Sequence, residues 1–97
     1  MKLHHIKVAD SYADKVLYKA KTFEIRLNDR NYKVGDIIVF NVVDSNGNYK
    51  WHSIEECVWQ ITYVLNEFEG LCKGYVIFSL KELTAVETLE QYGTDKL

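Results

Sequence analysis

The run from Ile37 to Val43, IIVFNVV, constrains the fold more than any other part of the sequence. It is apolar at both alternating sets of positions apart from Asn41, as expected of a strand that is covered on both faces. The polar segment DSNGN follows, and its Asn46-Gly47 pair is typical of a hairpin turn because these residue types tolerate positive φ. The sequence therefore predicts a buried strand followed by a tight turn.

Strand-type patterns also dominate the rest of the sequence. Apolar and β-branched residues over Lys2–Val8, Thr22–Leu27 and Tyr75–Leu80 predict three short strands. A longer alternating segment over Tyr49–Leu65 predicts a strand that is bent or bulged near Ser53–Glu55.

Two helices are expected, one near each end of the sequence. Apolar residues recur at helical spacing over Ser11–Lys19, and either Asp10 or Ser11 offers the N-cap. Near the C-terminus, Thr84 and Glu87 form a capping box, which predicts a short helix that ends near Gly93.

These elements predict a strand-dominated α+β fold in one domain, since 97 residues suffice for one modest core. A hydrophobic share of 47% excludes a disordered chain. With so many strands in a short chain, closing the sheet into a small β-barrel would remove exposed edges. We therefore predict a small barrel with an N-terminal helix and a short C-terminal helix.

The sequence also bounds the compartment. No apolar run approaches the roughly 20 residues that a membrane span needs, and the N-terminal MKLHHIKVAD lacks the apolar core of a secretion signal. Cys57 and Cys72 form no CxxC pair, which favours reduced thiols. The prediction is a cytoplasmic protein that makes no membrane contact.

Charge is unevenly distributed along the chain, although the formal net charge is only −2. Residues 1–33 contain eight lysines or arginines against four acids, whereas residues 34–97 contain four against ten. The affinity of nonspecific nucleic-acid binding grows with the number of phosphates that the protein neutralises. A protein that binds DNA strongly and without sequence preference is therefore excluded. A local basic cleft built from the first third of the chain remains compatible with this distribution.

Alternation along Thr22–Leu27 assigns its side chains to two faces. One face is expected to build the core and the other to line a cleft. The core face would carry Phe23, Ile25 and Leu27, and the cleft face Thr22, Glu24 and Arg26.

Three residues of this stretch have a structural interpretation beside a functional one. Lys21 would bind a phosphate or act as a base, or else be a solvated lysine favoured by the dipole of a preceding helix. Glu24 and Arg26 would form a lateral ion pair worth less than about 1 kcal/mol. Alternatively, Glu24 would accept a hydrogen bond from a base while Arg26 binds a phosphate.

The turn that follows adds Arg30 as a possible phosphate ligand, although Asn28 and Asp29 are ordinary turn formers. Exposed aromatic side chains would stack on bases, or else belong to the core. The candidates for stacking are Tyr32 and Trp51 first, then Tyr12 and Tyr75.

Histidines give little support for a metal or other cofactor. His4 and His5 are adjacent on a predicted strand and therefore point to opposite faces, and the remaining histidine is His52. We expect no metal and no cofactor. Lys7 lies two positions beyond His5 and would add positive charge to a cleft.

Four ordered motifs carry a family resemblance. They are K-T-F-E-I-R-x-N-D-R-x-Y-x-V-G-D (Lys21–Asp36), H-x-I-K (His4–Lys7), I-T-Y-V (Ile61–Val64) and F-E-G-L-x-x-G-Y-V (Phe68–Val76). Together they resemble the ASCH/PUA-like superfamily, and within it the small phage and bacterial group known as DUF3850. The resemblance covers about residues 1–80 as one domain and leaves residues 81–97 as a C-terminal tail.

The resemblance implies a PUA-like β-barrel in which the N-terminal helix and the following loop edge a cleft. Superfamily members are mostly RNA-binding modules, and their pattern of a small residue and K-x-x-E-x-R falls here on residues 20 to 26. The implied partner is RNA or a nucleotide. The implied contacts are His4, Lys7, Lys21, Glu24, Arg26, Arg30 and Tyr32.

Two alternatives remain open. Some ASCH-type members hydrolyse acylated cytidine nucleosides, which implies a small amidohydrolase with Lys21 as base, Thr22 assisting and Glu24 or Glu69 as the acid. Glu24, however, occupies the strand position where the hydrolytic relatives would carry a hydroxyl. In the other alternative, the acidic C-terminal half binds a protein partner through Glu82, Glu87 and Glu90.

Overall fold

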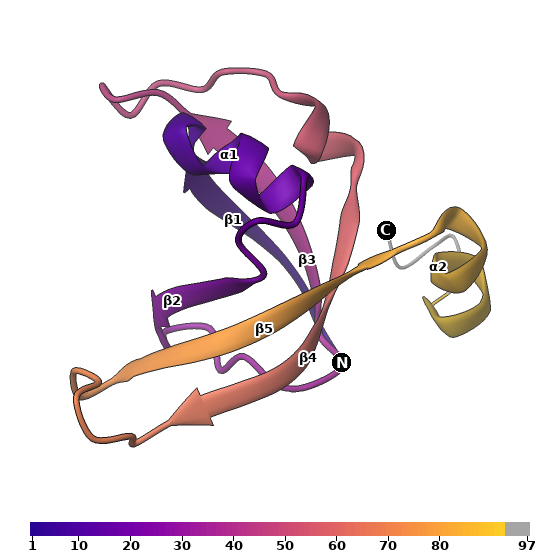
Figure 1. Ribbon diagram of the computed structural model, residues 1–97. Helices are drawn as coiled ribbons and strands as arrows, with labels where there is room; N and C mark the ends of the chain where they lie inside the picture. The colour runs from indigo at the N-terminus through magenta and orange to yellow at the C-terminus, as the bar shows by residue number, and fades with distance from the viewer. Residues whose placement is uncertain (93–97) are drawn as a thin grey trace.

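The computed structural model describes residues 1–92 and contains one five-stranded sheet with a helix near each end of the chain (Figure 1). The strand order across the sheet is β1-β3-β4-β5-β2. β1 pairs with β3 in parallel, and every other neighbouring pair is antiparallel. The elements are β1 (Leu3–Ala9), α1 (Asp10–Leu17), β2 (Phe23–Leu27), β3 (Ile37–Val43), the short 3₁₀ helix η1 (Ser53–Glu56), β4 (Val58–Asn66), β5 (Tyr75–Leu83) and α2 (Ala85–Tyr92).

The strand predicted from IIVFNVV is confirmed with its bounds. β3 lies between β1 and β4, and its side chains at Ile38, Phe40 and Val42 are fully buried. α1 packs against β1 and β3 and covers this part of the sheet (Figure 1). α1 packs on the core face of the strand, since Ala13 and Val16 lie in the same hydrophobic cluster as Phe40. The opposite face is buried at Ile37 and half-buried at its other positions, so the predicted coverage of both faces is only partial.

The sheet is open, so the predicted closed barrel is wrong. β1 and β2 are the two edge strands, and no strand pairing joins them within residues 1–92. Two arginines cross the gap instead: Arg26 Nη2 donates to the Lys7 carbonyl and Arg30 Nη1 donates to the His5 carbonyl, both at 2.5 Å. We call this gap between the outer edges of β1 and β2 the seam. Guanidinium groups reach across a distance that backbone pairing does not span, and they satisfy carbonyls that would otherwise lack a partner strand.

The predicted strand over Tyr49–Leu65 is divided. After the turn, where Gly47 has a φ of +81°, a single bridge pairs Val43 with Tyr49. The chain then forms η1 at the predicted bend before it enters β4. A bulge in β4 between Ile61 and Tyr63 shifts the alternation, so Tyr63 is exposed although Ile61 is buried.

Both helices form, with one cap as predicted and one not. α1 begins at Asp10, and its N-cap is Ala9, without a capping side chain, so neither Asp10 nor Ser11 caps it. The capping box before α2 is confirmed, since Glu87 accepts from the Thr84 amide at 3.0 Å and the Thr84 hydroxyl accepts from the Glu87 amide at 3.1 Å. The predicted helix end near Gly93 lies outside the described residues.

Across residues 1–92, the structure contains no helix with the length and apolar character needed to cross a membrane. Cys57 and Cys72 are both free thiols.

Candidate ligand-binding cleft

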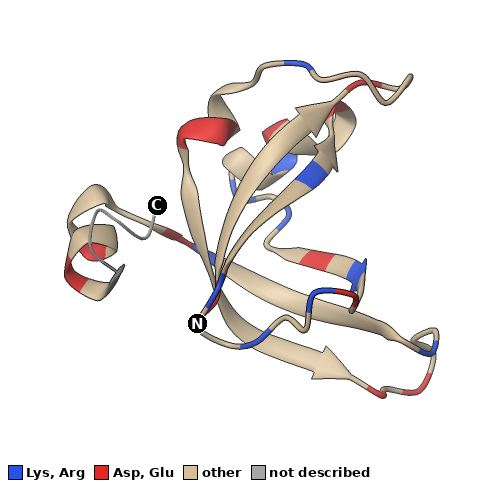
Figure 2. Cartoon of the chain, turned by 180° about the vertical axis from the view of Figure 1, so that it is seen from behind, with Lys and Arg blue, Asp and Glu red and all other residues tan. Residues whose placement is uncertain are grey.

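A cleft of about 680 Å³ opens between β1, α1 and β2. Its lining combines four cationic side chains with one carboxylate and several apolar groups. We call it the Lys21 cleft. Figure 2 shows lysine and arginine segments of β1, α1 and β2 gathered near the acidic segment of β2. The charged lining residues are Lys7, Lys15, Lys21, Arg26 and Glu24.

β2 alternates as predicted, but its two faces are reversed. Glu24 is only 4% exposed and lies directly opposite the fully buried Phe78 of β5. The three apolar side chains predicted for the core are instead exposed: Phe23 at 42%, Ile25 at 53% and Leu27 at 51%. The polar face of β2 points inward, and the apolar face points to solvent.

Paired cations explain why a buried carboxylate is tolerated at this position. The Lys21 ammonium contacts Glu24 Oε2, and Arg26 Nη2 lies 2.9 Å from Glu24 Oε1, so each carboxylate oxygen has a cationic partner. A buried charge is costly unless it is paired and hydrogen-bonded, and these two contacts supply both. Sequence alternation identified Glu24 and Arg26, the family resemblance added Lys21, and the structure brings the three together.

Lys21 is held by more than its ion pair. Its ammonium also donates to the Phe23 carbonyl at 2.7 Å, and it lies 5.6 Å from the Tyr12 ring centroid and 5.1 Å from that of Phe23. These are cation–π distances. The side chain is only 18% exposed, so the interpretation of Lys21 as a freely solvated lysine is wrong.

Two further cations of the cleft are differently placed. Within the described part of the chain, the ammonium groups of Lys7 and Lys15 have no ion-pair partner. Both residues are exposed and both line the cleft. They are therefore available to an anion, whereas Lys21 and Arg26 are already paired with Glu24.

Comparison with known proteins identifies the family. Residues 3–80 match the family model described as Domain of unknown function (DUF3850). The chain belongs to the DUF3850 family. No curated protein matches the sequence. The match covers β1 through most of β5, and with them every residue that lines the Lys21 cleft.

The seam extends the cationic surface of the DUF3850 domain. A smaller hollow of about 210 Å³ lies beside it and is lined by Arg26, Arg30 and Tyr32 among others. Arg26 lines this hollow as well as the Lys21 cleft. Arg30, predicted as a phosphate ligand, lines this hollow, and its guanidinium donates to the His5 carbonyl.

His4 and Tyr32, both predicted ligand contacts, belong instead to the interior. His4 is 5% exposed, and its Nε2 lies 2.8 Å from Oδ2 of the buried Asp36. The Tyr32 ring lies 4.8 Å from both the His4 ring and the Phe78 ring. With Tyr32 only 5% exposed, its ring faces are covered, so it is not a stacking platform for a base.

Asp36 was missed as a functional or structural residue because it follows a glycine in an apparent turn. It accepts from His4 and from the backbone amides of Lys2 and Lys33. Burial alone raises the pKa of the Asp36 carboxyl, but these hydrogen bonds outweigh it and hold the pKa below its ordinary value of 3.8. Burial likewise raises the pKa of the Tyr32 hydroxyl above 10.0.

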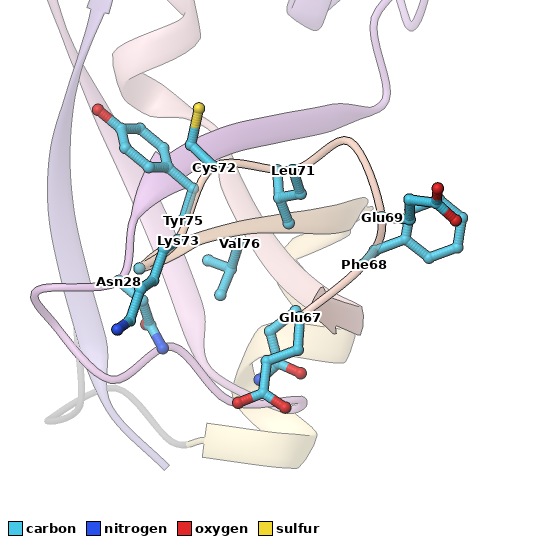
Figure 3. Close-up of a pocket in the computed structure, with 11 residues that line it drawn as sticks. Asn28, Glu67, Phe68, Glu69, Leu71, Cys72, Lys73, Tyr75 and Val76 are labelled. Carbon is cyan, nitrogen blue, oxygen red and sulfur yellow. The ribbon is translucent and has the colours of Figure 1, made fainter.

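The residues of the hydrolase hypothesis are only partly assembled. Thr22 is exposed, and its carbonyl accepts from the Leu80 amide. Glu69 lines a separate pocket of about 640 Å³ in the loop between β4 and β5 (Figure 3). That loop leads into Tyr75, which pairs with Leu27, so the loop lies beside the Leu27 end of β2. Lys21 lies just before Phe23, at the other end of the strand, so Glu69 and Lys21 are at opposite ends of β2.

The remaining predicted groups give no further site. Residues 1–92 contain no cluster of three potential metal ligands from histidine, cysteine, aspartate or glutamate. Of the acids proposed for a protein partner, Glu82 pairs with Lys19 and Glu87 pairs with Lys81. The other stacking candidates, Tyr12, Trp51 and Tyr75, are exposed, and among these three Tyr12 lines the Lys21 cleft.

Proposed function

We propose that this DUF3850 protein binds a nucleotide or a short stretch of single-stranded RNA in the Lys21 cleft. The observation that carries the proposal is the combination, in one cleft of about 680 Å³, of four cations around one carboxylate with exposed aromatic side chains. As part of this proposal, the domain is a PUA-like module of the ASCH type that acts in the cytoplasm.

Size and charge both support a nucleotide-sized anion. Small-molecule sites usually occupy about 300 to 1,000 Å³, and the cleft falls within that range. The formal charge of the lining is +3, from Lys7, Lys15, Lys21 and Arg26 against Glu24. An anionic ligand is favoured over a neutral or cationic one.

Some side chains of the cleft would bind the phosphate of the ligand and others would stack on its base. Lys7 and Lys15 would bind the phosphate, because their ammonium groups are not held by an acid in residues 1–92. Tyr12 is 49% exposed and Phe23 is 42% exposed, so both offer ring surface to a base. Glu24 would position Lys21 and Arg26 rather than contact the ligand, because both of its oxygens are already occupied.

Fluorescence anisotropy with short single-stranded RNAs and with mononucleotides, at low salt, tests the proposal. Lys15→Ala and Lys7→Ala should each weaken binding several-fold, whereas Lys33→Ala, an exposed lysine outside the cleft, should not. Each lost phosphate contact should also lower the salt dependence of the affinity. The proposal fails if no ligand binds, or if the three variants bind equally well.

The contact between Lys21 and Glu24 favours hydrolysis of an acylated nucleoside as a second candidate function. A lysine beside a carboxylate places a proton donor and a proton acceptor side by side. Incubation with acylated cytidine followed by chromatography tests it. Product formation that is lost in Lys21→Ala would support hydrolysis, and no product above that variant would exclude it.

A further inference from the structure

The outer face of the sheet formed by β2, β5 and β4 is apolar and uncovered. Residues directly opposite one another in an antiparallel pair share a face, and the register places Ile25 opposite Ile77 and Leu27 opposite Tyr75. Tyr75 and Val76 point to opposite sides of β5 (Figure 3), and Val76 is the buried one. We call this surface the outer sheet face; its main residues are Phe23, Ile25, Leu27, Tyr63, Tyr75 and Ile77.

The exposed area of this face is as large as the largest apolar patch of a typical monomer. Phe23, Ile25, Leu27, Tyr63 and Tyr75 are each between 40% and 61% exposed. At about 200 Å² for a large side chain, these fractions leave about 500 Å² of side-chain surface in water, with Ser79 lying between Phe23 and Tyr63. The largest apolar patch on a typical monomer is about 300 to 600 Å², and such patches are often functional.

The chemistry of the face selects its occupant. None of its six main side chains is charged, and Lys81, which follows at its edge on β5, is paired with Glu87 at 3.0 Å. Single-stranded nucleic acid needs cations beside the aromatic platform. Among these six side chains only Phe23, at the margin next to the Lys21 cleft, has a cation over its ring, the Lys21 ammonium at 5.1 Å. An uncharged face also presents no like-charge repulsion to an identical face on a chain whose net charge is −2.

We propose that the outer sheet face binds a second copy of this chain in a two-fold symmetric dimer. Such an interface is self-complementary, because each face packs on the same face of the partner at about 10 Å, as in a β-sandwich. Two faces of this size bury about 1,000 Å² in total, which is below the roughly 1,200 to 2,000 Å² of a stable specific interface and typical of a weak one. The dimer is therefore weak and forms as the concentration rises.

Ile25 lies at the centre of the interface. It is 53% exposed and directly opposite Ile77, with Leu27 and Phe23 on either side along β2. Central, desolvated side chains carry most of the energy of an interface. Phe23 and Ile25 also line the Lys21 cleft, so the partner copy would lie beside that cleft and cover the Phe23 ring, leaving Tyr12 as the aromatic side chain open to a base.

Sedimentation equilibrium of the full chain, up to millimolar concentration, tests the dimer. The wild type should move from the 11.4 kDa monomer towards twice that mass, and Ile25→Glu should remain at 11.4 kDa. Val34→Glu is the matched control: Val34 is 61% exposed but lies outside the face, so this variant should associate like the wild type. Tyr63→Glu, at an exposed position of β4, gives a second test should Ile25→Glu fail to fold.

Three outcomes would overturn the proposal. The wild type could stay monomeric at the highest concentration, or both face variants could fold, by circular dichroism, and still dimerise. Alternatively, Tyr63→Glu could abolish RNA binding without changing the mass, which would make the face a nucleic-acid platform. The mass measurement is made without ligand, so its result and that of the RNA titration are independent.

Discussion

Glu24 and Asp36 are buried carboxylates with different surroundings. Asp36 is 2% exposed and is held by a histidine and two backbone amides in the interior. Glu24 is 4% exposed and is held by Lys21 and Arg26, whose side chains keep 18% and 26% of their surface. His4, the side-chain partner of Asp36, is only 5% exposed, whereas the side-chain partners of Glu24 can turn to water or to a ligand. Burial of the acid alone therefore does not distinguish the two carboxylates, and the exposure of their side-chain partners does.

Removing Asp36 should have the largest effect. Asp36→Ala leaves His4 and the amides of Lys2 and Lys33 without their acceptor, and breaking a buried hydrogen-bonded pair costs about 3 to 5 kcal/mol. Urea unfolding followed by circular dichroism measures this loss. The distinction between the two carboxylates is wrong if Asp36→Ala lowers the free energy of unfolding by less than Glu24→Ala does.

Removing Glu24 should cost less stability but affect the ligand. Glu24→Ala frees two cations that can reach solvent, so we expect a loss of about 1 to 3 kcal/mol. The affinity for RNA, measured by fluorescence anisotropy, should fall, because Lys21 and Arg26 lose the group that orients them. Glu24→Gln is the control of similar shape. Unchanged RNA binding in the Ala variant would remove the positioning role assigned to Glu24.

Acid should act on Asp36 more gently than truncation does, because a protonated carboxyl still forms hydrogen bonds. The pKa of Asp36 is lower in the folded state than its ordinary value of 3.8. Its contribution is therefore fully present above that value and is lost as the pH falls through the lower folded pKa. Urea unfolding at a series of pH values should show a steeper acid loss in the wild type than in Asp36→Asn. Parallel curves would contradict this assignment.

The smallest stability effect is expected at the two unpaired cations of the cleft. Lys7→Ala and Lys15→Ala remove exposed side chains without a partner in the described structure, so stability should change by less than about 0.5 kcal/mol. Binding of RNA should nevertheless weaken in both. Thermal unfolding and anisotropy on the same samples separate the two effects. A large loss of stability would make these lysines structural.

Local patterns predicted those parts of the fold that depend on near neighbours. β3 was predicted with its bounds because an apolar run on both faces has few other placements, and the box of Thr84 and Glu87 depends on residues three apart. β2 was predicted with its alternation but not its direction. Alternation does not predict which face of β2 is buried, because a paired carboxylate, here Glu24, occupies a position that an apolar side chain would normally take.

The candidate site divides in the same way. Lys21, Glu24 and Arg26 were found together because they lie within six successive residues, in one strand and the segment that leads into it. The pair of His4 and Asp36 joins positions 32 residues apart, and no periodicity links them. The open sheet was also unpredictable, because a sequence count of strands does not say whether the last two edges meet as backbone or are bridged by Arg26 and Arg30.

The seam also has a kinetic consequence. A backbone ladder opens cooperatively and slowly, whereas an arginine side chain changes rotamer in picoseconds to nanoseconds. Arg26 lines the cleft and donates to the Lys7 carbonyl, so an arriving anion can replace that carbonyl as the acceptor without any strand moving. We therefore expect diffusion and charge to limit the rate of ligand binding. The Arg26 guanidinium would exchange one hydrogen-bond acceptor, the Lys7 carbonyl, for another, the anion.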